Sequence, residues 1–201
     1  VWKSFGSDVT IIEGLPHLIA LEDESSSKLL ERAFRKRGIK FELGVRFKSH
    51  KVKGDSVTVT LEDGREFTAD VLLVSVGRGP VTDGIGYQEL GITMDRGYIT
   101  VDDHCRTNIP GVWAVGDIIP TLQLAHVGFQ EGILVAETIA GLNPRPINYD
   151  GVPRVTYSEP EVASVGLSTK VAKERGYDVV ELDYNLAGNG KAQILKTAGS
   201  I

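Results

Sequence analysis

Residues 106–132, RTNIPGVWAVGDIIPTLQLAHVGFQEG, determine how the rest of the sequence is interpreted. A tight turn leads into a short apolar strand over residues 112–115, which ends at Gly116-Asp117, and a long helix is predicted to begin near Thr121. A carboxylate at the end of a buried strand, beside a helix N-terminus, lies where α/β proteins bind polar cofactors, because the helix presents unbonded N–H groups there. The stretch therefore predicts a cofactor-binding strand, turn and helix within an α/β fold.

The composition is ordinary for a globular protein, with 201 residues, 41% hydrophobic and 24% charged, and a net charge of −5. This modest acidity argues against nucleic-acid binding, because no basic stripe is available to neutralise phosphates. No apolar run approaches the roughly 20 residues of a membrane span, and no signal-peptide pattern opens the sequence. The single cysteine, Cys105, is typical of a reducing, cytoplasmic setting, and the pair His104-Cys105 alone is not a metal site.

The N-terminal residues predict the rear half of a βαβ dinucleotide-binding fold. Residues 1–5 have the pattern of the last turns of a helix closed by Gly6, and residues 8–13 predict a buried strand that ends at Glu13. A strand-end carboxylate in this fold accepts hydrogen bonds from the adenine ribose and repels the extra phosphate of NADP. Glu13 is therefore a candidate NAD-binding residue. The glycine-rich loop that normally precedes such a helix is expected to lie outside this sequence.

The remaining elements follow from local patterns. Helices are predicted over residues 21–37, for a short stretch from Tyr87, over 121–141 and over 168–175. Strands are predicted over residues 39–43, 56–61, 65–69, 71–76, 98–101, 154–157, 162–166 and 178–184. The Asp63-Gly64 pair is a strong hairpin signal, and the uninterrupted apolar run 71–76 predicts a fully buried strand. Residues 196–201 carry no pattern of a closing element.

The 106–132 stretch resembles the second flavin-binding segment of the pyridine nucleotide-disulfide oxidoreductases. In that family the matching aspartate bonds the ribitol of FAD, and the matching helix start lies against the flavin ring. The helix of this chain has no acidic residue before Glu131, so its positive end is left for the electron-rich edge of a reduced flavin. The flavin contacts that the resemblance implies are Asp117, Gln123, Leu124, Ala125 and His126, with the helix contacting mainly through its main chain.

The resemblance also assigns NAD contacts. NADP-using relatives such as glutathione reductase carry a basic residue in the region of Glu13, whereas the NAD-linked lipoamide dehydrogenases carry Glu. Phe47 falls where the family contacts adenine largely through main chain, although a core strand residue is an equal alternative. Gly77, in a stretch that resembles the family's Gly-Arg-x-Pro-Asn element, would let the nicotinamide half of NAD approach the backbone. A turn that needs an unusual dihedral angle is the alternative for Gly77.

The resemblance extends over the whole sequence and implies three parts. Residues 1–79 resemble the rear of an NAD-binding domain, 80–150 the returning half of an FAD-binding domain with its central sheet, and 151–201 the start of an α+β dimer-interface domain. The fold class implied is therefore α/β, with two partial Rossmann-like dinucleotide-binding domains. Within the family, three features most resemble bacterial dihydrolipoamide dehydrogenase: the residue Glu13, the sequence Leu124-Ala-His126 and residues 189–197.

That enzyme reoxidises the dihydrolipoyl groups of 2-oxoacid dehydrogenase complexes with FAD and NAD, as a homodimer. The family's redox dithiol and its His-Glu pair are expected outside this sequence, so no catalytic residue is assigned here. Two alternatives stay open. One is another flavoenzyme of the family, such as a mercuric reductase-like protein or a transhydrogenase, and the other is a non-catalytic piece that folds or dimerises without turnover.

Overall fold

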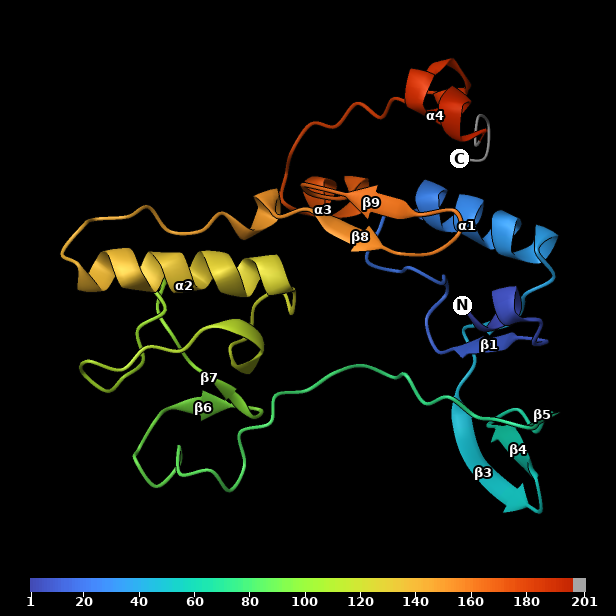
Figure 1. The fold of residues 1–201 in the computed structure, drawn as a ribbon, viewed down its shortest axis with the longest axis horizontal. Coiled ribbons are helices and arrows are strands. Elements are labelled where there is room, and N and C mark those ends of the chain that lie inside the picture. Colours follow the sequence, from blue (N-terminus) through green and yellow to red (C-terminus); the bar gives the residue numbers. More distant parts are fainter. Residues whose placement is uncertain (197–201) are drawn as a thin grey trace. The chain divides into compact units, whose positions relative to one another are not determined.

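The computed structural model describes residues 1–196, which form two compact units (Figure 1). One unit joins Val1–Val74 to the segment from Pro153 onward, and the other is Ser75–Val152. Residues 197–201 lie outside the described residues, and they include Thr197, the last residue of the 189–197 stretch. Among residues 1–196, none of the helices has the length and apolar character needed to cross a membrane.

The first unit opens with the predicted second half of a βαβ fold. The 3-10 helix η1 (Trp2–Phe5) ends at Gly6, whose φ of 96° is left-handed. Strand β1 (Thr10–Glu13) pairs in parallel with β2 (Lys40–Leu43), and α1 (Glu24–Lys36) forms the crossover that a parallel pair requires. This arrangement confirms the α/β fold class.

Helix α1 begins three residues later than the predicted residue 21, at Glu24. The residue before it, Asp23, does not cap its own helix. Its Oδ1 instead accepts a hydrogen bond from the backbone N–H of Thr169 at 2.7 Å, from the C-terminal part of the same unit. Arg154 adds an ion pair with Glu22, with Nε and Oε1 3.5 Å apart. The start of α1 is therefore fixed by contacts that are distant in the sequence.

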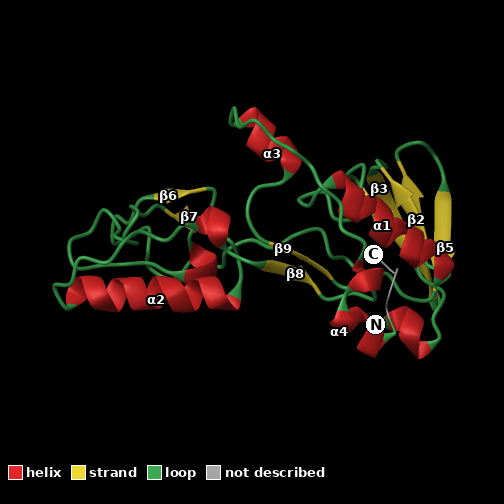
Figure 2. Ribbon diagram, turned by 90° about the horizontal axis from the view of Figure 1, so that it is seen from above, coloured by secondary structure: helices red, strands yellow, loops and turns green. Residues whose placement is uncertain are grey.

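An antiparallel sheet follows, formed by β3 (Phe47–Lys53), β4 (Ser56–Leu61) and β5 (Glu66–Ala69) (Figure 2). The predicted hairpin at Asp63-Gly64 is confirmed, and the Asp63 carboxylate accepts the Arg65 N–H at 3.1 Å. Burial alternates along β4, with Val57, Val59 and Leu61 inside. Strand β3 was not among the predicted strands, because all of its side chains are exposed and it shows no apolar alternation.

The C-terminal part of this unit contains β8 (Arg154–Thr156), which pairs antiparallel with β9 (Val162–Ser164), and α3 (Thr169–Glu174). These elements confirm the predictions for residues 154–175. Short helices η4 (Leu186–Gly188) and α4 (Gly190–Leu195) follow. The strand predicted over 178–184 is wrong: Val180 and Leu182 are exposed and no described strand lies beside them.

The second unit packs short strands against one long helix. Strands β6 (Met94–Asp95) and β7 (Tyr98–Ile99) form a hairpin, and α2 (Ala125–Ile139) is the main helix, with η2 (Gly116–Ile118) before it and η3 (Tyr149–Gly151) after it. The buried core of this unit consists of Ile92, Ile99, Cys105, Ala114, Ile119 and Leu134.

Three predictions differ from the structure here. The short helix from Tyr87 is a series of turns, and the strand 112–115 is reduced to a single bridge between Trp113 and Arg106. The long helix begins at Ala125 rather than Thr121, because the backbone of Leu124 is extended and the Thr121 N–H donates to the carbonyl of Ile119 at 2.8 Å.

The predicted buried strand 71–76 is also wrong for this structure. Residues 71–76 are assigned no strand, and Val76 is 92% exposed. A fully buried strand needs hydrogen-bonded neighbours and covering side chains. Within residues 1–196, no strand pairs with this segment.

Candidate cofactor-binding sites

Glu13 lies at the carboxyl end of β1, opposite Leu43 of β2. Its Oε1 accepts a hydrogen bond from the backbone N–H of Leu15 at 2.9 Å, and its side chain is half-buried. The backbone at Gly14 lies close to the connection between β2 and β3. A Cβ built on Gly14 would lie 3.7 Å from the carbonyl oxygen of Val45 in that connection. The carboxylate is therefore oriented by its own loop and remains partly exposed.

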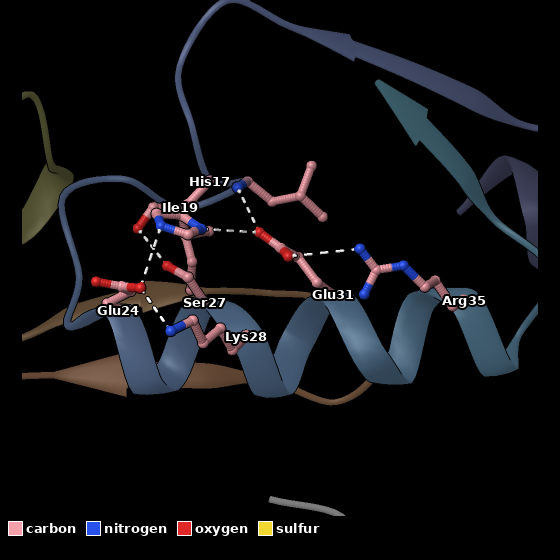
Figure 3. Close-up of polar contacts among 8 residues, drawn as sticks. His17, Ile19, Glu24, Ser27, Lys28, Glu31 and Arg35 are labelled. Carbon is pink, nitrogen blue, oxygen red and sulfur yellow. Dashed lines mark hydrogen bonds and ion pairs between the residues drawn. The ribbon is translucent and has the colours of Figure 1, made fainter. Parts of the chain in front are cut away.

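The loop that follows Glu13 is held on α1 by a second, buried carboxylate (Figure 3). Glu31 is buried, and its Oε1 lies 3.3 Å from Nδ1 of His17 and accepts the backbone N–H of Leu18 at 3.4 Å. Arg35 approaches the other oxygen of Glu31 at 3.8 Å. These contacts fix the loop relative to the helix that completes the βαβ unit.

Further contacts fix the same loop at the first turn of α1. Ser27 is fully buried and its hydroxyl donates to the carbonyl of Ile19 at 3.1 Å. Glu24 forms an exposed ion pair with Lys28 at 2.6 Å, and the hydrogen bond from that ammonium lowers the pKa of Glu24. Exposed pairs of this kind contribute little to stability, so Ser27 and Glu31 are the residues that hold the loop.

For Phe47 and Gly77, the surrounding structure says less about a binding role than it does for Glu13. Phe47 begins β3, is 52% exposed, and has its ring centroid 6.2 Å from that of His50. Gly77 has a φ of 123°, and a Cβ built there would meet nothing within 4 Å. The left-handed backbone, rather than lack of space, is therefore what requires glycine at residue 77. Glu13 and Phe47 belong to the first unit, whereas Gly77 belongs to the second.

Asp117 lies in η2, directly before the segment that leads into α2. Its side chain is 50% exposed, and Oδ2 lies 3.6 Å from Nη1 of Arg78. Gln123 is brought to the same place, since its Nε2 donates to the backbone carbonyl of Asp117 at 3.4 Å. Two of the predicted flavin residues, Asp117 and Gln123, are thus hydrogen-bonded to each other, and Arg78 lies beside the Asp117 carboxylate.

The other three predicted residues form the start of α2. Leu124 is the N-cap, in extended conformation, and Ala125 and His126 are the first two helical residues. The side chain of Leu124 makes no cap hydrogen bond, and the first turn contains no acidic residue. Because first-turn N–H groups have no acceptor within a helix, this end favours an anionic or electron-rich group.

Glu131 is a residue whose role the sequence analysis did not identify. It lies in the middle of α2 and is 0% exposed. Its Oε2 accepts the Gly116 N–H at 2.6 Å, and its Oε1 accepts the hydroxyls of Thr121 at 2.8 Å and Tyr149 at 3.0 Å. Burial, with the bond to this carboxylate, raises the pKa of Tyr149. The signal available in the sequence was an acidic residue on the same helical face as two apolar residues, Val127 and Leu134.

Cys105 is unsuited to redox or metal chemistry. The side chain is 2% exposed, and burial raises the pKa of its thiol to about 11, with the charges of Glu131 and Asp102 adding to the effect. Within the described residues 1–196, no group of three or more His, Cys, Asp and Glu side chains is arranged to hold a metal ion.

Comparison with known proteins assigns these features to a family. A protein-family sequence model described as "Pyridine nucleotide-disulphide oxidoreductase" matches residues 1–132. The sequence model of that family's dimerisation domain matches residues 152–200. The chain is 42% identical over 197 residues to the dihydrolipoyl dehydrogenase of Cupriavidus necator, covering 96% of this chain and 41% of the relative. It is 41% identical to that of Bacillus subtilis, covering 95% and 42%.

Solved structures give the same result. LpdA from Mycobacterium tuberculosis matches with a TM-score of 0.90 at 29% identity, over 98% of this chain and 43% of that one. The HOCl-induced flavoprotein disulfide reductase RclA from Escherichia coli matches with a TM-score of 0.88 at 25% identity, over 98% and 46%. The chain spans about 42% of the length of the curated relatives it matches.

Proposed function

Because the chain belongs to the pyridine nucleotide-disulphide oxidoreductase family, we propose that it forms part of an FAD-dependent dihydrolipoamide dehydrogenase. Such an enzyme reoxidises dihydrolipoyl groups with NAD. The family was predicted from the sequence, and the comparisons confirm it. The observation that carries the proposal is the geometry of residues 116–126, where a half-exposed aspartate precedes by eight residues a helix start that its N-cap side chain leaves uncapped.

The residues of the second unit fit a flavin. The Asp117 carboxylate is accessible enough to accept a hydrogen bond from a ribitol hydroxyl, and Gln123 steadies the backbone at that point. The main chain from Leu124 to His126 presents the positive end of α2 to an electron-rich ring edge. FAD, when bound, supplies the two-electron chemistry that links a dithiol to a nicotinamide.

The residues of the first unit fit the adenosine half of NAD. Glu13 would accept hydrogen bonds from the adenine ribose, which a 2′-phosphate would abolish, so the proposed nucleotide is NAD rather than NADP. Phe47 would lie beside the adenine, and the Gly77 backbone would lie against the nicotinamide half.

The domain assignment follows the same proposal. Residues 1–79 contribute to an NAD-binding domain, 80–150 to an FAD-binding domain and 151–201 to a dimer-interface domain. The match to the family's dimerisation domain supports a homodimer. The proposed partners are the lipoyl-bearing subunits of 2-oxoacid dehydrogenase complexes, and the proposed location is the cytoplasm.

A different flavoprotein disulfide reductase is the second candidate. The likeness to RclA, with a TM-score of 0.88, favours it. The two candidates share the flavin and nucleotide residues and differ in the substrate that is oxidised or reduced. Steady-state assays of the active enzyme with dihydrolipoamide and with other dithiols would separate them, because only the first candidate prefers dihydrolipoamide.

The flavin assignment is tested by titrating FAD with the active enzyme that contains this chain and with its Asp117→Ala variant, following flavin fluorescence. Loss of a hydrogen bond to a charged group costs about 1.5–3 kcal/mol, so the dissociation constant should rise about 10- to 100-fold. Asp83→Ala is the matched control, since Asp83 is an exposed aspartate of the same unit. Equal FAD affinity in Asp117→Ala and the unaltered chain would show that Asp117 is only a turn residue.

A further inference from the structure

The side chain of Glu131 is fully buried although it is acidic, in contrast to Asp117 at the surface of the same unit. A buried carboxylate is costly unless hydrogen bonds replace its lost water. Here three donors reach its two oxygens, from Gly116, Thr121 and Tyr149, at 2.6, 2.8 and 3.0 Å. A residue retained at this cost, with two of its three bonds directed at the segment 116–121, indicates a role in holding that segment.

The donors are arranged on both sides of Asp117. Gly116 precedes it by one residue and binds Oε2, whereas Thr121 follows it by four residues and binds Oε1. The two bonds therefore fix both ends of the segment 116–121. A Cβ built on Gly128 would lie 3.6 Å from the Cα of Gly116, so α2 also packs closely against the start of this segment.

We infer that Glu131 is a positioning residue that fixes the segment 116–121 on α2 and thereby places the Asp117 carboxylate for the flavin. The inference rests on the proposed FAD function. Glu131 itself is fully buried, and its oxygens accept hydrogen bonds from Gly116, Thr121 and Tyr149. Its effect is that Asp117 and the start of α2, which contact different parts of the flavin group, are held as one rigid unit.

The two carboxylate oxygens give a sharp test, because an amide has only one acceptor oxygen. Glu131→Gln keeps the shape of the side chain but can accept from Gly116 or from Thr121, not from both. Tyr149→Phe is the matched control, since it removes a bond to Oε1 and leaves both ends of the segment attached. Thr121→Val releases one end without altering the carboxylate, and serves if Glu131→Gln does not fold.

Two measurements are made on each variant: FAD affinity by fluorescence titration, and hydrogen exchange of the Gly116 and Asp117 amides in the flavin-free chain. Glu131→Gln and Thr121→Val should weaken FAD binding by about tenfold, the loss of one hydrogen bond at this site, and should speed exchange in the segment. Tyr149→Phe should leave the FAD dissociation constant within about twofold, even if its melting temperature falls.

The outcomes separate the inference from the function it rests on. If the unaltered active enzyme that contains this chain does not bind FAD, the proposed function fails and the inference fails with it. If that enzyme binds FAD and its Glu131→Gln and Thr121→Val variants bind it equally well, only the inference is overturned. Variants that melt earlier yet keep the same FAD affinity and the same amide exchange would show that Glu131 is purely structural.

Discussion

The thiol of Cys105 should be chemically inert in the folded chain, and the size of the effect follows from its surroundings. Burial raises its pKa from 9.0 to about 11. Two pKa units lower the thiolate fraction about 100-fold at any pH below the ordinary value. A more basic thiolate is also about tenfold more nucleophilic, so the net slowing is about tenfold before access is considered. With 2% of the side chain exposed, the observed slowing should be larger.

The assay compares the reaction of Cys105 with an aromatic disulfide reagent in buffer and in urea, at about pH 8. Because the sequence contains one cysteine, the absorbance change reports on this thiol alone. We expect the folded chain to react at least about tenfold more slowly than the unfolded chain. Rates that agree within about twofold would refute the buried, electronegative environment described for Cys105.

The same pKa shift predicts a dependence of stability on pH. Below pH 9.0 the thiol is protonated in both the folded and the unfolded chain, so the contribution to stability is fully present. Between 9.0 and about 11 the unfolded chain loses the proton while the folded chain keeps it, and the free energy of unfolding falls by up to about 2–3 kcal/mol. Cys105→Ser, measured by urea denaturation at several pH values, should remove this part of the decline.

The remaining predictions concern the nucleotide and the core. Glu13→Arg should raise the affinity for NADPH relative to NADH by at least about tenfold in nucleotide-fluorescence titrations. The reason is that a guanidinium, which can donate hydrogen bonds to the 2′-phosphate, replaces a carboxylate. An unchanged ratio of the two affinities would show that Glu13 is an ordinary surface charge. Leu61→Ala, at a side chain 0% exposed, should cost about 2–5 kcal/mol in urea denaturation. Leu73→Ala, at an exposed leucine, should change stability by less than about 0.5 kcal/mol, and equal losses would contradict the burial pattern.

Local patterns were sufficient where a segment's structure depends on its neighbours in sequence. The β1, α1 and β2 series and the hairpin at Asp63-Gly64 were predicted because apolar periodicity and turn residues encode them directly. The strands predicted over 71–76 and 178–184 did not form, because an apolar strand also needs partners that no local pattern specifies. The exposed strand β3 was not predicted, because the buried side chains lie on its partner β4 and β3 itself has no apolar pattern.

The candidate sites were predicted only in part. Strand-end carboxylates can be found from their position, so Glu13 and Asp117 were identified, and their cofactor roles stay predictions. The buried carboxylates Glu31 and Glu131 were not identified, because a sequence pattern places acidic residues at the surface unless their hydrogen-bond donors are known. Those donors lie 10 to 18 residues away from each glutamate along the chain.

The exposed run 71–76 has a consequence for how the chain behaves in concentrated solution. Its sequence, VLLVSV, combines high strand propensity with no charge, no proline and no glycine, and its backbone lies open in this structure. Segments of this kind template intermolecular strand pairing and aggregation. The charges of Asp70 and Arg78 flank the run and act as gatekeepers against such pairing. We therefore expect the colloidal stability of the chain to depend on the charges of Asp70 and Arg78.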